Sequence, residues 1–130
     1  MADIVTVQTI ADVAGVKHVA KMTNLSDGTG ESLVTKIDAS NTNAMTEDAT
    51  KVLARIWSSI NATNTNAAVE LLWGGSTNSP LVLLNGQGHW DLRTFGDGIV
   101  NNATTPTGDI LLSTRNFVSG DNYTIVVEFR

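Results

Sequence analysis

The sequence predicts an all-β protein, specifically a jelly-roll-like β-sandwich of two sheets with about eight or nine strands. Three observations support this prediction. Apolar and β-branched residues occur in short runs, most of them alternating with a period of two. Gly, Asn, Asp and Ser separate these runs at nearly regular intervals. The chain has 130 residues, of which 42% are hydrophobic and 16% charged, so we expect a single globular domain over residues 1–130.

The N-terminal part of the chain predicts three strands. Residues 4–10 alternate between two faces, and residues 16–25 repeat this pattern. A polar turn follows, and its Asp27-Gly28 pair is a strong hairpin signal. Residues 31–39 then alternate again, so we expect them to return as the third strand.

The segment at residues 47–60 is ambiguous. Its apolar residues have helical spacing, but Val52, Ile56 and Ile60 also fall on one face of a strand. Periodicity alone cannot assign a short apolar run. The Asn/Thr-rich turn at residues 61–66 favours a strand that continues through a hairpin, with a helix as the alternative.

The remaining sequence predicts five further strands, separated by turns and loops rich in Gly and Asn. A turn is expected at residues 74–76, and a long loop at residues 96–108. Pro80 suits the first position of a strand or an edge strand. The five predicted strands cover residues 67–73, 80–84, 89–95, 109–115 and 122–129.

The charge distribution argues against nucleic acids and membranes as partners. The formal net charge is -5, and the eight Lys and Arg residues are scattered singly instead of forming a basic patch. The chain has no Cys, which excludes disulfides and thiolate metal sites. We see no signal-like start and no apolar run of the roughly 20 residues that a membrane span needs, so we expect synthesis in a cytosol.

No sequence pattern predicts a catalytic, cofactor or metal site. His18 and His89 are the only histidines, and we expect both at strand surfaces or ends. Residues 27–31 carry two carboxylates and two glycines, but a hairpin turn accounts for them without bound calcium. Residues 74–78 resemble a nucleophile elbow only superficially, because the second Gly and the following helix are missing. A carboxylate pair for glycoside chemistry stays open, although nothing in the sequence pairs the available residues Glu70, Asp91, Asp97 and Asp109.

Two segments are suited to contact a partner. The strand at residues 2–9 can add to a neighbouring sheet. Trp90 begins a strand beside Gly-rich loops, and Trp is enriched at interfaces, although burial in the core is the alternative. The predicted interface residues are Ile4, Val5, Val7, Trp90, Arg93 and Phe95.

Seven stretches of the chain are informative through their order and spacing. They are residues 1–10, 22–32, 56–57, 72–73, 98–102, 107–110 and 119–124. In this arrangement they resemble the small virion structural proteins of tailed bacteriophages, marine phages especially. The similarity covers most of the chain, with residues 41–49 and 76–88 matching least well, and no one motif is diagnostic.

The resemblance implies a component of a virus particle, and we favour a capsid decoration (cement) protein that binds the major capsid protein of the same virion. We expect a homo-oligomer, with a trimer favoured, because several weak contacts gain strength through avidity. Such a protein lies on the capsid surface of a virion assembled in the bacterial cytoplasm, and the resemblance carries over no catalytic residues. The open alternatives are a tail, neck or fibre-associated β module, a carbohydrate-binding β-sandwich for host attachment, and an enzyme on a β-sandwich scaffold.

Overall fold

The structure is a computed structural model that describes residues 3–45, 51–96 and 98–130, except for the side chain of Phe95. It confirms the all-β prediction, because the described residues form nine strands in two antiparallel sheets and no α-helix. Two short 3-10 helices are η1 (Ala39–Asn41) and η2 (Leu92–Phe95). The strands are β1 (Ile4–Val13), β2 (Lys17–Leu25), β3 (Val34–Ile37), β4 (Leu53–Asn61), β5 (Ala68–Thr77), β6 (Ser79–Leu84), β7 (Gln87–Asp91), β8 (Thr104–Arg115) and β9 (Asn122–Phe129).

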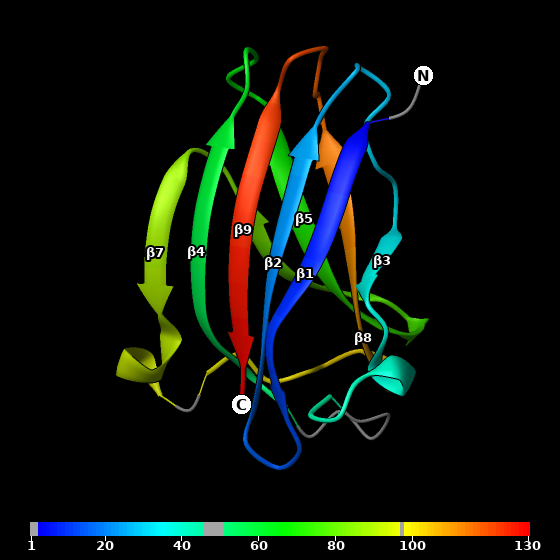
Figure 1. The fold of residues 1–130 in the computed structure, drawn as a ribbon, viewed down its shortest axis with the longest axis vertical. Helices are drawn as coiled ribbons and strands as arrows, with labels where there is room; N and C mark the ends of the chain where they lie inside the picture. The colour runs from blue at the N-terminus through cyan, green and yellow to red at the C-terminus, as the bar shows by residue number, and fades with distance from the viewer. Residues whose placement is uncertain (1–2, 46–50, 97) are drawn as a thin grey trace.

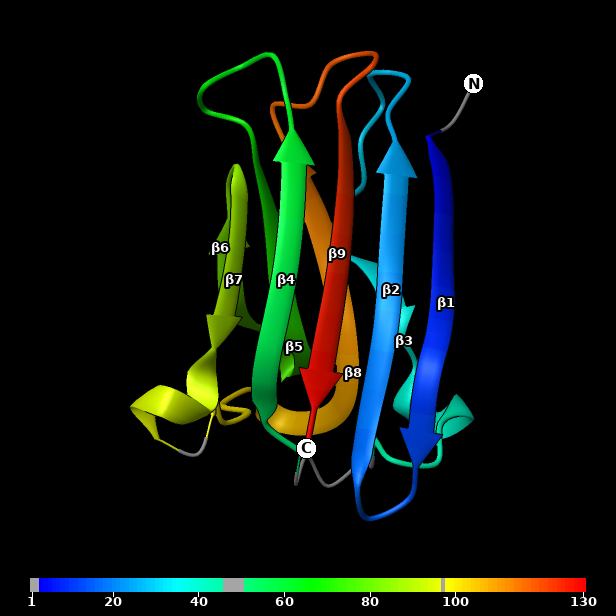
Figure 2. The ribbon, with the colours of Figure 1, turned by 60° about the vertical axis from the view of Figure 1, so that its left-hand side comes forward.

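The two sheets lie face to face and form a β-sandwich (Figures 1 and 2). The first sheet has the strand order β1-β2-β9-β4-β7, and the second has the order β3-β8-β5-β6. The strand pairs are nested along the chain, because β2 pairs with β9, β3 with β8, β4 with β7 and β5 with β6. Successive pairs alternate between the two sheets, so β2–β9 and β4–β7 lie in the first sheet and β3–β8 and β5–β6 lie in the second. This arrangement leaves β1 and β7 at opposite edges of the larger sheet.

One buried hydrophobic cluster fills the space between the sheets. Alternation places Tyr123, Ile125, Val127 and Phe129 of β9 on the inner face, where each is 1% exposed or less. Trp73 of β5 meets Phe129 edge to face, with ring centroids 5.6 Å apart. Full burial of a side chain of this kind contributes about 1.5–3 kcal/mol, so contacts of this type across the core stabilise the packing of the two sheets.

The ambiguous segment at residues 47–60 forms a strand from residue 53 onward. β4 lies between β9 and β7 and pairs with both. Ile56 and Ile60 are buried, while Trp57 turns to the outer face of the sheet. Pairing on both sides therefore outweighs the helical spacing of the apolar residues. Residues 47–50 of this prediction lie outside the described residues.

The predicted turn at residues 74–76 is wrong, because these residues lie inside β5. β8 begins within the predicted loop at residues 96–108 and pairs with this part of β5. A side chain at Gly75 would collide with the carbonyl oxygen of Thr104. Glycine at this position therefore permits close approach of two strands and does not mark a turn.

The predicted strand at residues 89–95 is also partly wrong, because β7 ends at Asp91 and η2 follows. The Asp91 carboxylate accepts a hydrogen bond from the backbone nitrogen of Arg93 at 3.1 Å. The Thr94 hydroxyl donates to the carbonyl oxygen of Asp91 at 2.8 Å. These local hydrogen bonds stabilise a tight turn in competition with the strand.

Candidate functional site

A surface with several exposed apolar side chains lies along β1. Ile4 is 64% exposed, Val5 43% and Val7 42%. β1 pairs with β2 on one side, and no described strand pairs with its other side. The backbone groups along that edge can therefore pair with another chain. Residues 4–11 carry no charged side chain, so the edge presents only apolar and uncharged polar groups.

Both faces of β1 contribute to this surface. Val5 and Val7 are register partners of Asn24 and Met22, which are buried, so the two valines lie on the inner side of the sheet. They stay exposed because β1 is an edge strand beside β3, the shortest strand of the other sheet (Figures 1 and 2). Ile4 lies on the outer side. The structure thus brings together the three N-terminal residues of the predicted interface.

The other predicted interface residues lie at the opposite edge of the same sheet. Trp90 belongs to β7 and is 49% exposed, so the alternative of a core role is wrong. Arg93 is exposed in η2. Phe95 belongs to η2, and its side chain lies outside the described part of the structure. The predicted interface is therefore divided into two surfaces, one on each side of the sandwich.

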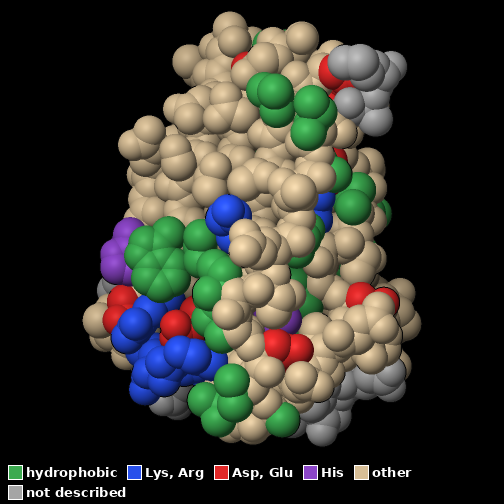
Figure 3. Space-filling model, in the orientation of Figure 1, with side chains coloured by type: hydrophobic (Ala, Val, Ile, Leu, Met, Phe, Trp, Pro, Cys, Tyr) green, Lys and Arg blue, Asp and Glu red, His purple; other side chains and the backbone are tan. Residues whose placement is uncertain are grey.

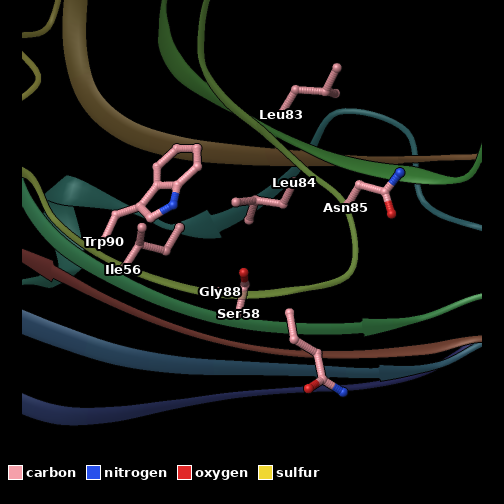
Figure 4. Close-up of a pocket in the computed structure, with 8 residues that line it drawn as sticks. Ile56, Ser58, Leu83, Leu84, Asn85, Gly88 and Trp90 are labelled. Carbon is pink, nitrogen blue, oxygen red and sulfur yellow. The ribbon is translucent and has the colours of Figure 1, made fainter.

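Trp90 lines a pocket of about 200 Å³ between the two sheets, at the side where β6 and β7 form their edges. Figure 4 shows Trp90 and Ile56 side by side, with Leu84 pointing toward them from β6. Ser58 and Asn85 add polar groups to the lining. Apolar walls with a few polar groups are typical of pockets that accept an apolar side chain or a small ligand.

An aromatic pair that the sequence did not reveal lies on the outer face of the larger sheet. Trp57 and His89 are register partners on β4 and β7, and their rings stack at 4.9 Å. Arg55 and Asp91 form the ion pair at the adjacent outer-face position, with Nε and Oδ2 3.3 Å apart. Figure 3 shows green, purple, blue and red side chains together over β4 and β7. Alternation with Ile56 could have placed Trp57 on the outer face, but only the β4–β7 register brings His89 beside it.

Two rows of side chains extend from the aromatic pair across all five strands of this sheet. The row that contains the pair consists of Gln8, Lys21, Val126, Trp57 and His89. The next row consists of Thr6, Thr23, Thr124, Ser59 and Gln87. The hydroxyl groups of Thr6 and Thr23 are hydrogen-bonded to each other. Much of the upper part of this face is tan in Figure 3, so it offers hydrogen-bonding groups with few charges.

A cluster of polar side chains lies inside the sandwich. The Glu31 carboxylate contacts the Lys36 ammonium group, and these two side chains are 5% and 2% exposed. The same carboxylate accepts hydrogen bonds from Asn24 Nδ2 at 2.7 Å and from the Tyr123 hydroxyl at 2.6 Å. Burial raises the pKa of Tyr123 far above its usual value, and the hydrogen bond to Glu31 adds to this effect. Buried charges need such partners, because an isolated one is very costly.

The predicted strand at residues 31–39 is shorter than expected, since β3 covers only four residues.

The loop before β3 is held by Asp3. The Asp3 carboxylate accepts hydrogen bonds from the backbone nitrogens of Asp27 at 3.1 Å and Gly30 at 3.2 Å, and from Asn24 Nδ2 at 3.0 Å. Burial raises the pKa of Asp3, but these hydrogen bonds outweigh it, so the net pKa lies below its usual value. Asp3 thereby fastens the start of β1 to this loop.

His18 is the second residue of β2, so it lies at a strand end as predicted, but it is not at the surface, because it is 1% exposed on the inner side of the strand. Its Nδ1 lies 3.2 Å from Asp12 Oδ1. Asp12 also accepts hydrogen bonds from the backbone nitrogens of Asn43 and Ala44, both at 2.8 Å. Burial alone raises the pKa of Asp12, but these hydrogen bonds lower it by a larger amount. The net pKa of Asp12 is therefore below its usual value. His89 is exposed, as predicted. No group of three or more side chains suited to hold a metal ion occurs among the described residues.

The other residues considered for catalysis make separate contacts. The Ser76 hydroxyl donates to a backbone carbonyl of β8 at 3.1 Å. Glu70 forms an ion pair with Arg115 at 3.1 Å. Asp109 accepts a hydrogen bond from the backbone of η1 at 2.8 Å. Asp97 lies outside the described residues. Each described group therefore has a local contact of its own.

Comparison with known proteins does not assign the chain to a family. No family model, no curated protein and no solved structure matches it. Within the described ranges, no helix is long and apolar enough to cross a membrane. The functional argument therefore depends on the surfaces and the buried cluster described above.

Proposed function

We propose that this chain is a structural protein of a bacteriophage virion, most specifically a capsid decoration (cement) protein that stabilises contacts between major capsid protein subunits. The resemblance of the sequence suggests the particle, and the exposed apolar edge at β1 is the observation that carries the binding role. Nine of the thirteen exposed large hydrophobic residues in the described part of the chain lie between residues 4 and 34, namely Ile4, Val5, Val7, Ile10, Val13, Val16, Leu25, Leu33 and Val34. This concentration of exposed apolar side chains supports a role of this part of the fold in contact with another protein.

The edge of β1 is suited to main-chain pairing with a capsid subunit. Edge strands are usually protected by short length, Lys, Pro or bulges. β1 has ten residues with no Lys and no Pro, and its pairing with β2 is irregular only between Thr9 and Ala11. An added strand gains affinity from backbone hydrogen bonds and specificity from alternate side chains. Val5 and Val7 on one face and Ile4 on the other supply those side chains.

The two free edges of the larger sheet support a ring of identical subunits. β1 and β7 lie at opposite edges, so a contact between unlike edges of neighbouring copies is heterologous. Heterologous contacts close into a ring when the rotation between copies allows it. A trimer of this kind suits a local threefold axis of a shell and presents three binding surfaces at once, which raises the overall affinity.

The nested strand order supports a jelly roll as the finer description of the fold. A jelly roll consists of two packed sheets built from two Greek keys, and it occurs in viral capsid proteins and in lectins. This support is an analogy of fold, because one fold hosts many functions. It agrees with a particle role and equally with the carbohydrate-binding alternative.

Binding to capsid shells tests the proposal. Purified protein is mixed with expanded shells that lack it, and cosedimentation is measured. We expect saturable binding that protects the shells against heat. The Val5→Lys/Val7→Lys variant should lose binding, because it places two ammonium groups on the apolar edge. Val100→Lys is the matched control at an exposed valine outside β1 and should bind normally. A parent protein that is monomeric and does not bind expanded shells would contradict the proposal.

Location in the particle separates the cement role from a tail, neck or fibre role. Electron microscopy of native particles should show many copies on the shell lattice. A small number of copies confined to the neck or tail would instead support the alternative within the virion. In that case the apolar β1 edge would contact a tail or neck subunit.

A carbohydrate-binding role is the second candidate, and the Trp57–His89 pair favours it. A partly exposed aromatic ring next to the row of hydroxyl and amide groups suits the binding of a sugar ring, since Trp combines a large apolar face with a polar tip. A depression on this face is lined by Trp57, Ser59, Gln87, Thr124 and Val126. A glycan array tests this role: a hit that Trp57→Ala abolishes and Trp90→Ala preserves supports it, and the absence of any hit contradicts it.

A further inference from the structure

The buried cluster around Glu31 places an amine and a primary amide in contact with the same carboxyl group. Lys36 Nζ touches Oε2 of Glu31. Asn24 Nδ2 donates a hydrogen bond to Oε1 of the same carboxyl group at 2.7 Å. The amine and the amide therefore meet on the two oxygens of one carboxyl group. All three residues are buried.

The three residues come from different parts of the sandwich. Asn24 belongs to β2 in the five-stranded sheet, and Lys36 belongs to β3 in the four-stranded sheet. Glu31 is fixed to β8, because its backbone nitrogen donates to Thr114 Oγ1 at 2.8 Å and its carbonyl oxygen accepts from the Thr114 nitrogen at 2.9 Å. The Tyr123 hydroxyl donates to Glu31 Oε1 at 2.6 Å. The contacts with Thr114 and Tyr123 thus hold the Glu31 carboxyl group in place between the Lys36 amine and the Asn24 amide.

Two features of this cluster are costly if it serves packing alone. Buried polar atoms are normally satisfied, yet Asn24 Oδ1 is buried and has no hydrogen-bond partner among the described residues. A buried Lys–Glu pair also carries a desolvation cost that apolar residues of similar size would avoid. The position of Lys36 and Glu31 beside the Asn24 amide points to chemistry in addition to packing.

We propose that Lys36 and Asn24 join in an intramolecular isopeptide bond, with Glu31 as the acid–base group. Glu31 takes a proton from the Lys36 ammonium group and leaves a neutral amine. The lone pair of Nζ attacks Cγ of Asn24, and the bond between Cγ and Nδ2 breaks. In total, two protons of Nζ pass by way of Glu31 to Nδ2, which leaves as ammonium. The products are an amide between Nζ and Cγ, ammonium, and Glu31 as a carboxylate again.

Burial promotes this reaction in two ways. A low-dielectric interior makes separate charges costly, so proton transfer that yields a neutral amine and a neutral carboxylic acid is less unfavourable there than in water. The fold also holds nucleophile, electrophile and acid–base group together, which replaces a bimolecular encounter by an intramolecular step of high effective concentration. The reaction needs no oxidant, metal or second substrate.

The bond ties one sheet to the other and closes a covalent loop over residues 24–36. Such a crosslink restricts the unfolded chain and opposes separation of β2 from β3, as a disulfide does in other small domains. The chain has no Cys for that purpose. This inference does not depend on the decoration role, because it concerns only the interior of the sandwich.

Mass spectrometry of the full-length protein tests the inference. We expect an intact mass about 17 Da below the sequence mass, the loss of one ammonia, after allowing for removal of Met1. Trypsin should fail to cleave after Lys36, and the product should be peptide 22–51 with the same deficit. Fragmentation should place the link between Asn24 and Lys36. A protein of full sequence mass that trypsin cleaves after Lys36 would overturn the proposal.

Three variants separate the isopeptide bond from other losses of ammonia, such as cyclisation of an asparagine onto the backbone. Lys36→Met removes the nucleophile, and Glu31→Gln removes the acid–base group while keeping its shape. Both should have the full mass. Lys21→Met, a change of another lysine on β2, is the matched control and should keep the deficit. If the mass deficit persists in Lys36→Met, the ammonia is lost in another reaction. If the mass deficit persists in Glu31→Gln, Glu31 is not the acid–base group. Either result overturns the proposal as stated.

Discussion

Trp57 and His89 stack as register partners on β4 and β7, with ring centroids 4.9 Å apart and ring planes inclined by 3°. This contact predicts that the two residues are energetically coupled. A double-mutant cycle with Trp57→Ala and His89→Ala should give a coupling of about 0.5–1.5 kcal/mol in the free energy of unfolding, measured with urea. Trp57→Ala combined with Val118→Ala, in the turn before β9, is the control and should be additive. Full additivity of the Trp57 and His89 changes would show that the stack contributes nothing.

The positions of two tryptophans predict very different stabilities for matched variants. Trp73 is 1% exposed and packs on Phe129, whereas Trp90 is 49% exposed in the pocket near β6 and β7. Trp73→Ala should cost about 3–5 kcal/mol, because it leaves a cavity between the sheets. Trp90→Ala should cost far less. The midpoints of urea unfolding measure both, and equal losses would contradict the assignment of Trp73 to the core and Trp90 to a surface pocket.

The close approach of β5 and β8 predicts that Gly75 does not tolerate a side chain. A Cβ at Gly75 would collide with the carbonyl oxygen of Thr104. Gly75→Ala should therefore destabilise the protein by about 1–3 kcal/mol, since one of the two strands must shift. Gly88→Ala is the matched control in β7, where the nearest atom to the added Cβ, Trp90 Nε1, is 3.9 Å away. Thermal unfolding compares the two variants, and a neutral Gly75→Ala would mean that the strands are not so close.

The hydrogen bonds of the Asp121 carboxylate predict that the folded protein loses stability in acid. Its carboxylate accepts hydrogen bonds from the backbone nitrogens of Val118 at 2.9 Å and Thr63 at 3.0 Å. These bonds, with the Val118 bond the strongest influence, outweigh burial and lower the pKa of Asp121 below its usual value of 3.8. The carboxylate therefore stabilises the fold fully above the pKa of the unfolded chain. That contribution disappears as the pH falls through the lower pKa of the folded chain.

The variant Asp121→Asn measures this effect. It should reduce the free energy of unfolding at neutral pH by about 1–3 kcal/mol, because an ionised acceptor of several hydrogen bonds is lost. The difference from the parent should shrink as the pH falls below about 4. Urea unfolding over a series of pH values gives both quantities. The pKa values of Asp3 and Asp12 are shifted in the same direction, so the variant should keep part of the acid sensitivity. A difference that does not change with pH would contradict the assignment.

Most strands could be predicted from the sequence because their signals are local. The alternation at residues 122–129 coincides with β9, and residues 80–84 lie within β6. The period of two also placed Ile56 and Ile60 on one face of a strand, and the structure buries both. The cause is physical, since successive side chains of a strand point to opposite faces whatever the strand pairs with.

Two of the errors depend on contacts with distant segments, and the third has a local cause. Gly75 was expected in a turn because the sequence does not show that β8 approaches it. His18 was expected at a strand surface or end, and its burial was missed because the backbone of residues 43–44, which binds its neighbour Asp12, is distant in the sequence. The strand predicted at residues 89–95 ends at Asp91, because local hydrogen bonds stabilise the turn of η2 after it.

The sequence alone was sufficient to establish an all-β chain, the positions of most strands and the faces of several side chains. Only the tertiary structure decided which strands are neighbours, and with that the β1 edge, the Trp57–His89 stack and the cluster around Glu31. Tyr123 reaches Glu31 across 92 positions of the chain. Alternation is a property of a few consecutive residues, whereas register and sheet order depend on packing between distant segments, which a short stretch of sequence does not contain.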